Sequence, residues 1–388
     1  MSFANLIVAV AAMLLPTHLR DWGTAMRAEV GEIEGGGTRY ALSCLGFAAR
    51  AAIDFHLLRP LRLPLDARED PTPNEEPTGM RLTRDLFQRP WRMTAACAIA
   101  ATGLGLAYLS AAGAPVRYLA INLGALLIGF VAVAIVLAGQ RGGRINAGAV
   151  GVTLGAALLL TSLLGQPVDG ATRWIAVGPL FIQPSLILLP IMTIAFARAR
   201  DVLSTAGILA AAAALALQPD RAMAGALAAG LVALTLIRPE RNVLVALAGA
   251  GIGFAVTLLR ADTLPAVPYV DQILYTSFAV SPLAGLAVFA GVALMLVPAI
   301  VGRLYDVDHQ EAYAVFGAVW LAVIAAAALG NYPTPVVGYG GSAIIGYVVS
   351  LLGLPKPASA SAKERAAMPT PDTPERPDTR CAGISYSV

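Results

Sequence analysis

Between residues 93 and 354 the chain alternates apolar stretches with short polar connections. Each apolar stretch is free of Asp, Glu, Lys and Arg. A membrane core of about 30 Å needs about 20 apolar residues per helix, and shorter helices can cross it within a crowded bundle. The pattern therefore predicts ten transmembrane helices, at about residues 93–113, 118–138, 146–165, 180–197, 202–217, 222–237, 243–259, 279–301, 312–329 and 336–354.

The arginines between these stretches are concentrated in every second connection. One set of connections carries Arg141, Arg144, Arg198, Arg200, Arg238, Arg241 and Arg303, and the other set carries Arg117, Arg173, Arg221 and Arg260. Seven further arginines precede the first stretch, between residues 59 and 92. Cytoplasmic connections carry an excess of Lys and Arg. We therefore expect both ends of the ten-helix core to lie on the cytoplasmic side of the membrane.

The chain before this region follows a different pattern. Residues 3–15 are apolar but short, the next segment has apolar residues at helical spacing between charged ones, and residues 39–58 are again mostly apolar. This pattern predicts one or two additional hydrophobic helices and an amphipathic helix that lies on the membrane or on partner helices. We expect residues 1–58 to be an accessory membrane-associated unit.

Two segments are rich in proline and charge, and neither can bury enough apolar surface to fold alone. Residues 59–92 are predicted to be a cytoplasmic linker, and residues 355–388 a disordered cytoplasmic tail. With the N-terminal unit and the ten-helix core of residues 93–354, the pattern divides the chain into four parts.

Composition excludes a soluble protein. Hydrophobic residues make up 57% of the 388 residues, charged residues make up 13%, and the mean hydropathy is +0.70. Soluble domains carry about 25% charged residues. A net charge of +3 does not favour nucleic acid as a partner, and the three cysteines and three histidines have no spacing typical of a disulfide framework or a metal site. The chain is predicted to be an all-α integral membrane protein.

Because the spans carry no charge, candidate chemistry lies at the span ends predicted to face outside. Arg173 beside Trp174 can hold a phosphate at headgroup depth, or can simply anchor the chain at the interface. Asp220 next to Arg221 is either a self-neutralising turn or a carboxylate that faces a substrate groove. Asp271, in the longest outer connection, is a candidate general base.

Tyr339, Gly340, Gly341 and Ser342 lie near the start of the last predicted span. Glycines at a helix start leave backbone N–H groups at its positive end, which is a natural anion site. The same pair of glycines can also serve close packing of helices.

Taken in order, three of these segments resemble motifs of the SEDS family, the FtsW/RodA-type proteins of shape, elongation, division and sporulation. That family carries a GxRRWI…GP…QPSE stretch, a QPDxGTA stretch and a PLPxxSYGGSS stretch. Here the corresponding segments are GATRWIAVGPLFIQPSL, QPDRAMA and PTPVVGYGGSA, within residues 93–354. The resemblance carries the following residues onto family positions: Arg173, Trp174, Gln183, Pro184, Ser185, Asp220, Pro333, Pro335, Tyr339, Gly340, Gly341 and Ser342.

The resemblance implies a ten-span SEDS-like bundle in the bacterial inner membrane, with both ends of the core cytoplasmic. It implies peptidoglycan glycosyltransfer on a lipid-linked precursor at the outer membrane face, together with a class B penicillin-binding transpeptidase or other division proteins. Arg173 and the Gly340–Gly341 helix start are the candidates for its phosphates, and Trp174, Gln183, Asp220, Tyr339 and Ser342 for other substrate contacts.

The sequence also departs from the family pattern. The glutamate of QPSE is Leu186 here, and a lysine three residues later is Leu189. The family places its essential aspartate in a longer loop and in an HTDFIF-like context. Asp271 is the nearest counterpart, as a base or as a carboxylate that holds a divalent cation.

Three functions are therefore open. The first is a divergent glycosyltransferase for cell division or cell shape, with Asp271 as the catalytic residue. The second is a SEDS-like membrane scaffold that binds precursor or division proteins without turnover. The third is a flippase for the lipid-linked precursor, which the absence of charge inside the spans disfavours.

Overall fold

The computed structural model describes residues 3–15, 19–31, 33, 37–53, 90–139, 147–168, 171–178, 180–260 and 265–355. The predicted linker of residues 59–92, apart from its last three residues, and the predicted tail of residues 355–388, apart from its first residue, lie outside the described residues. The chain divides into two units, residues Met1–Pro77 and Thr78–Val388, and each is described by itself.

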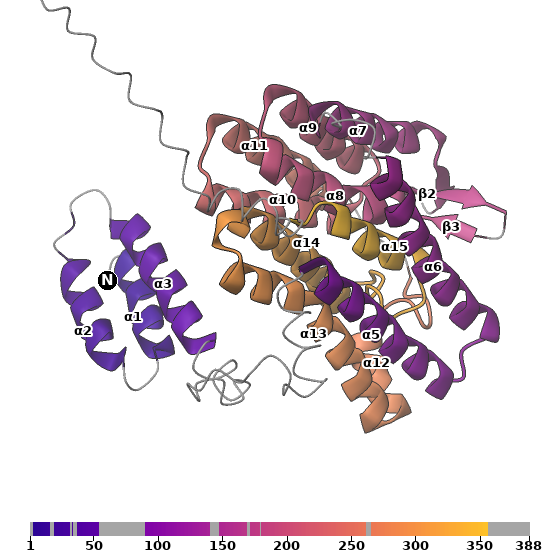
Figure 1. Ribbon diagram of the computed structural model, residues 1–388, viewed down its shortest axis with the longest axis horizontal. Coiled ribbons are helices and arrows are strands. Elements are labelled where there is room, and N and C mark those ends of the chain that lie inside the picture. The colour runs from indigo at the N-terminus through magenta and orange to yellow at the C-terminus, as the bar shows by residue number, and fades with distance from the viewer. Residues whose placement is uncertain are drawn as a thin grey trace, which may run out of the picture. The chain divides into compact units, whose positions relative to one another are not determined.

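The N-terminal unit contains three helices, α1 (Phe3–Leu14), α2 (Arg20–Glu29) and α3 (Gly37–Ile53) (Figure 1). Helix α1 packs against both others. Their shared core buries small and medium apolar side chains, among them Val8, Met26 and Cys44. The charged residues of α2 are exposed, and the Tyr40 hydroxyl on α3 donates a hydrogen bond to Glu29. The unit is therefore amphipathic, with one apolar core and one charged helix.

In the core unit, each of the ten predicted apolar stretches folds as a helix (Figure 1). These helices are α5 (Pro90–Ala111), α6 (Val116–Gly139), α7 (Ala147–Leu164), α8 (Pro184–Ala199), α9 (Val202–Leu217), α10 (Arg221–Ile237), α11 (Arg241–Leu258), α13 (Pro282–Tyr305), α14 (Gln310–Leu329) and α15 (Gly341–Val349). Among the described residues of this unit, every charged side chain lies in a connection or within one turn of a helix end.

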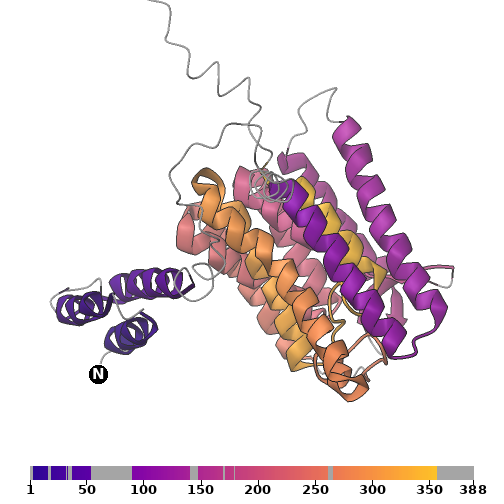
Figure 2. The same cartoon turned by 60° about the horizontal axis from the view of Figure 1, so that its bottom comes forward.

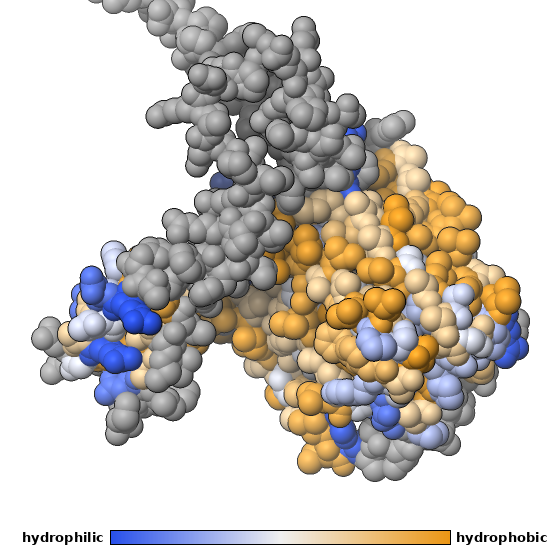
Figure 3. Space-filling model, turned by 90° about the horizontal axis from the view of Figure 1, so that it is seen from below, coloured by the Kyte–Doolittle hydropathy of each residue, from blue (hydrophilic) through white to orange (hydrophobic). Residues whose placement is uncertain are grey.

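Five of these helices are long and apolar enough to cross a membrane: α5, α6, α11, α13 and α14. In the other five the apolar helical segment is shorter, at Gly148–Leu164, Pro184–Ala199, Val202–Leu217, Arg221–Ile237 and Gly341–Leu352. The surface of the core unit is mostly hydrophobic in the view of Figure 3. The exposed apolar side chains of this unit include Leu127 and Leu164. Such a surface requires lipid rather than water around it. The prediction of an all-α multi-pass membrane protein is confirmed.

Two elements of the core unit were not predicted. A small antiparallel sheet connects α7 to α8 through β1 (Gln166–Val168), β2 (Ala171–Val177) and β3 (Leu180–Ile182), with Ile175 paired to Ile182. A short helix, α12 (Ile273–Val280), precedes α13. Most of these residues lie in the predicted connections, and β1, β3 and α12 are too short for a hydrophobic period to identify them.

The buried centre of the core unit is formed by α8, α10, α14 and α15. Their largest fully buried side chains include Phe196, Trp320 and Tyr347. Helices α7 and α9 approach more closely than side chains would allow. A Cβ atom on Gly207 of α9 would lie 2.5 Å from the backbone of Gly151 on α7. A Cβ atom on Gly155 of α7 would likewise lie 2.5 Å from the Gly207 carbonyl oxygen, so this contact depends on glycine at positions 155 and 207.

The polar connections gather at the two ends of the bundle (Figure 2). At one end Arg200 pairs with Glu240 at 3.1 Å, and Asn242 donates to the Arg200 carbonyl at 2.7 Å. At the other end lie the α5–α6 connection, the sheet, α12 and the segment before α15, which are joined by the hydrogen bonds described below.

We predict that Gly207→Ala destabilises the core unit by about 1–3 kcal/mol, because the added methyl group overpacks the α7–α9 contact. The measurement is thermal unfolding of the purified protein in detergent. Gly251→Ala on α11 is the matched control, because nothing lies within 4 Å of a Cβ atom there. Equal melting temperatures for the two variants would contradict this account of the packing.

Candidate functional site

Asp220 is the best-connected polar group at this end of the bundle. It is the N-cap of α10, and its side chain is fully buried. Its Oδ2 accepts hydrogen bonds from Gln183 Nε2 at 3.0 Å and Ser185 Oγ at 2.8 Å, and its Oδ1 accepts one from the Met223 backbone N–H at 3.3 Å. A buried carboxylate is stable only with such partners. Asp220 therefore fastens the start of α8 to the start of α10.

Gln183 extends this network to α15. Its backbone N–H donates to Ser342 Oγ at 3.0 Å, while its side chain bonds Asp220. Gln183 directly follows β3 and Ser342 is the second residue of α15. The three motif segments of the sequence therefore meet, although up to 159 residues separate these partners.

Arg173 lies on β2 and is buried. Its Nη2 donates to the carbonyl of Pro219, the residue before Asp220. Its guanidinium carbon lies 5.8 Å from the centroid of the Trp174 ring and 5.9 Å from that of Tyr332. Both distances suit cation–π contact. The guanidinium thus holds the turn that presents Asp220 and also contacts the segment before α15.

Asp271 lies just before α12 and is also buried, with 8% of its surface exposed. Its Oδ2 accepts a hydrogen bond from the Val267 N–H at 2.8 Å, and its Oδ1 has no hydrogen-bond partner among the described residues. It forms an isolated antiparallel bridge with Pro333. Burial raises the pKa of this carboxyl above its ordinary value, and the bond from Val267 partly opposes the rise.

Tyr339 adjoins the same connection. Its backbone N–H donates to the Tyr269 carbonyl at 2.7 Å, and its ring stacks on Tyr118 of α6 with centroids 3.8 Å apart. Gly340 donates its N–H to Asn122 Oδ1 at 3.2 Å, so this amide of the predicted anion site already has a protein partner. Helix α15 begins at the next residue, Gly341.

All of the predicted site residues thus lie in one connected region. The Asp220 network reaches Ser342 through Gln183, Arg173 contacts Tyr332, and Asp271 bridges the residue that follows Tyr332. No described hydrogen bond joins Asp220 to Asp271 directly. The two carboxylates therefore belong to separate sets of hydrogen bonds.

Sequence reasoning gave no role to four residues of this region, although two of them, Tyr269 and Tyr332, lie in its candidate segments. The four are Tyr118, Asn122, Tyr269 and Tyr332. Asn122 carried a usable signal, because it is the one amide in an otherwise apolar predicted span and a membrane helix seldom keeps an unbonded amide. The three tyrosines carried none, since tyrosine is common at membrane interfaces.

A resident metal ion is not favoured by these residues. No group of three or more His, Cys, Asp or Glu side chains that could hold a metal ion occurs in the described part of the chain. Asp271 supplies one carboxylate with one unpartnered oxygen. A divalent cation there would take most of its ligands from substrate and water.

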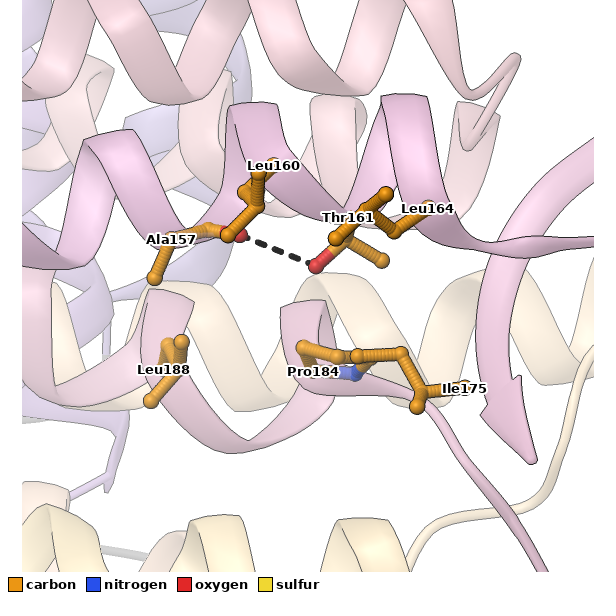
Figure 4. Close-up of a pocket in the computed structure, with 7 residues that line it drawn as sticks. All are labelled: Ala157, Leu160, Thr161, Leu164, Ile175, Pro184 and Leu188. Atoms are coloured by element: carbon orange, nitrogen blue, oxygen red, sulfur yellow. Dashed lines mark hydrogen bonds between the residues drawn. The ribbon is translucent and has the colours of Figure 1, made fainter. Parts of the chain in front are cut away.

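An apolar groove of about 270 Å³ adjoins the region (Figure 4). It lies between α7 and α8 and is closed at one end by Ile175 of β2. Its lining is Ala157, Leu160, Thr161, Leu164, Ile175, Pro184 and Leu188. The hydroxyl of Thr161 donates to the Ala157 carbonyl at 3.0 Å, so the groove offers an apolar guest no free hydroxyl donor. Pro184 is next to Gln183, and the groove therefore begins beside the Asp220 network.

No protein-family model and no curated protein matches this sequence. Solved structures similar to the chain include two crystal structures of one protein. The crystal structure of Thermus thermophilus rod shape determining protein RodA has 24% sequence identity and a TM-score of 0.48, and covers 67% of this chain and 93% of its own. A mutant of the same protein has 23% identity and a TM-score of 0.48, and covers 67% of this chain and 94% of its own.

We predict that Asp220→Ala lowers the free energy of unfolding by about 3 kcal/mol, because it removes an N-cap and leaves buried donors without an acceptor. The matched control is Glu240→Ala, which removes an exposed carboxylate whose pair with Arg200 is worth less than about 1 kcal/mol. Thermal unfolding in detergent measures both. A smaller loss for Asp220→Ala than for the control would contradict the structural role of Asp220.

The raised pKa of Asp271 predicts a specific pH dependence of stability. The folded protein binds this proton more tightly than the unfolded chain, so the contribution is fully present below the ordinary pKa of 3.8 and is lost as pH rises through the folded pKa. Asp271→Asn removes that loss and keeps an acceptor for Val267. We expect the variant to gain stability relative to wild type at about pH 7, and this gain to shrink towards about pH 4. A gain that grows on acidification would contradict the direction of the pKa shift.

Proposed function

We propose that this chain is a divergent SEDS-type membrane protein that transfers glycosyl units from a lipid-linked peptidoglycan precursor at the outer membrane face. The observation that carries the proposal is the meeting of the three SEDS-like motif segments and Asp271 at one end of the bundle. Arg173, Asp220, Ser342 and Asp271 come from four separate parts of the chain, and hydrogen bonds and ring contacts link their segments.

Charge supports the outer face as the location. The end that carries the motifs has the fewer arginines, whereas the opposite end carries the arginine-rich connections, including Arg198, Arg200 and Arg303. By the positive-inside rule the motif end faces outward and both ends of the core face the cytoplasm. We assign the protein to a bacterial inner membrane on the basis of its resemblance to the SEDS family.

In the proposed reaction, a hydroxyl of the acceptor sugar attacks the anomeric carbon of the donor, and the bond from that carbon to the polyprenyl diphosphate breaks. Asp271 takes the hydroxyl proton on its unpartnered Oδ1. A raised pKa suits this role, because a general base works best when its pKa is near the working pH. The diphosphate leaves with both electrons of the broken bond.

The leaving diphosphate requires positive charge, and its lipid chain requires an apolar surface. Arg173 is a cation of the motif region, and the helix start at Gly341 offers partial positive charge. The groove between α7 and α8 supplies that apolar surface beside Gln183. A prenyl chain that lies along the helices is long enough to reach it. Trp174 and Tyr339 are the aromatic faces of the proposed substrate site.

One observation favours a non-catalytic scaffold as the alternative. Leu186 and Leu189 stand where the family carries a glutamate and a lysine, and both are buried in the main apolar core. The chain therefore packs hydrocarbon where a SEDS polymerase has charge. In this alternative the same region binds the precursor, or a class B penicillin-binding protein or another division protein, without turnover.

We further propose that the N-terminal unit is accessory. Its three helices have their own core, and residues 1–58 carry none of the motif segments. The amphipathic α2 and the apolar α1 suit a position at the membrane surface.

The test is polymerisation of purified lipid-linked disaccharide precursor by the full chain, with and without a class B transpeptidase. We predict that Asp271→Asn lowers the rate by about 100-fold or more, because it removes the base but keeps the side-chain size. The matched control is Asp262→Asn, which changes the other carboxylate of the same connection.

Equal loss in the two variants, or full activity of Asp271→Asn, would overturn the role of Asp271. If wild type makes no polymer under any condition but binds the precursor, the scaffold replaces the enzyme. Translocation of precursor across reconstituted vesicles without polymer would instead favour the flippase.

A further inference from the structure

Helix α6 contributes two side chains that none of the motif segments contains. The helix is mostly lipid-facing, with Leu123 58% exposed and Leu127 65% exposed. Asn122 lies next to Leu123 but is fully buried. An amide inside an apolar span is unfavourable unless both its N–H and its carbonyl are bonded. The position therefore requires a specific polar partner.

The partner is the backbone on both sides of Tyr339. Asn122 Nδ2 donates to the Gly338 carbonyl at 2.8 Å, and Asn122 Oδ1 accepts from the Gly340 N–H at 3.2 Å. One side chain thus bonds the residue before and the residue after Tyr339. A neighbouring β-strand would bond the backbone in this way, but here one amide side chain makes both bonds. The two bonds restrict the backbone on both sides of Tyr339.

Tyr118 lies four residues earlier, so it is on the same face of α6 as Asn122. Its ring stacks on that of Tyr339 with centroids 3.8 Å apart and an interplanar angle of 10°. The same ring makes an edge contact with Tyr269 at 6.1 Å. Tyr339 also donates its N–H to the Tyr269 carbonyl, two residues before Asp271. Helix α6 therefore holds both the backbone and the ring of Tyr339 against the connection that carries Asp271.

We propose that Asn122 and Tyr118 are positioning residues that preassemble the segment before α15 beside Asp271. The proposal rests on the proposed function of this site. It adds two residues of α6 that lie outside the sequence motifs. Neither residue needs to touch substrate, because each acts through Tyr339. Removing either side chain releases residues 338–340. The segment then lies farther from Asp271 or is misaligned with it, so turnover slows although no group that binds substrate is removed.

The experiment compares Asn122→Ala, Tyr118→Ala and Tyr118→Phe with Leu123→Ala as the matched control on the lipid-facing side of the same helix. Hydrogen exchange in the full-length protein reports the order of residues 334–342 without requiring activity. We expect exchange at the Gly340 amide to be about tenfold faster or more in Asn122→Ala and unchanged in Leu123→Ala. Tyr118→Phe, which keeps the stacking ring, is expected to restore most of the order that Tyr118→Ala loses.

Polymerisation kinetics form the second readout. We expect kcat to fall by about 10-fold to 100-fold in Asn122→Ala and Tyr118→Ala with KM changed less than about twofold, and Tyr118→Phe to recover most of kcat. A purely structural role would instead lower the amount of folded enzyme and leave kcat per folded molecule unchanged.

Two outcomes would overturn the inference. The first is exchange in residues 334–342 that is the same in Asn122→Ala and Leu123→Ala, whatever the activity. The second is faster exchange with unchanged kcat in an enzyme that polymerises. Absence of polymer in wild type would reject the proposed catalysis, and hydrogen exchange would then still decide whether α6 orders this segment. If Asn122→Ala does not fold, the comparison of Tyr118→Ala with Tyr118→Phe tests the inference instead.

Discussion

The requirement that buried polar groups find partners inside the protein governs the motif end of this molecule. The carboxylate of Asp220 has no access to water, so its acceptors must be satisfied by Gln183, Ser185 and the start of α10. Those bonds fix the beginning of α8 relative to α10, and the backbone of Gln183 then reaches α15 through Ser342. Because the surrounding helices are apolar, few other contacts could define the register between these elements.

For Asp271 the requirement that a buried polar group has partners within the protein is only partly met. It is nearly as buried as Asp220, yet one of its oxygens has no partner among the described residues, and burial raises its pKa. The environments of the two carboxylates therefore separate their roles. A fully bonded carboxylate stabilises the fold, and a partly bonded one retains the capacity to accept a proton or bind a ligand.

This division also bears on the SEDS-type function proposed above for a chain with so few charges. The apolar replacements at Leu186 and Leu189 lie in the packed core beneath the site, where they strengthen the scaffold and remove charge from it. The polar groups that remain are at the end of the bundle, and Asn122 adds one from α6. The contacts that order this region are therefore mostly hydrogen bonds that involve the backbone or neutral side chains.

The sequence by itself determined where the helices of the core lie, which end of the bundle carries fewer arginines, and which segments hold the candidate chemistry. Those features depend on hydropathy, charge and short motifs, which are local properties of the chain. It did not reveal β1–β3 or α12, which lie mostly in the connections and are too short for a hydrophobic period to identify them. Only the tertiary structure decided that Arg173 bonds the Pro219 carbonyl, that Asp220 is fully bonded while Asp271 is not, and that Asn122 holds Tyr339. Such contacts join residues as far as 218 positions apart, and hydrogen bonding in a buried site depends on distance and direction that no local pattern encodes.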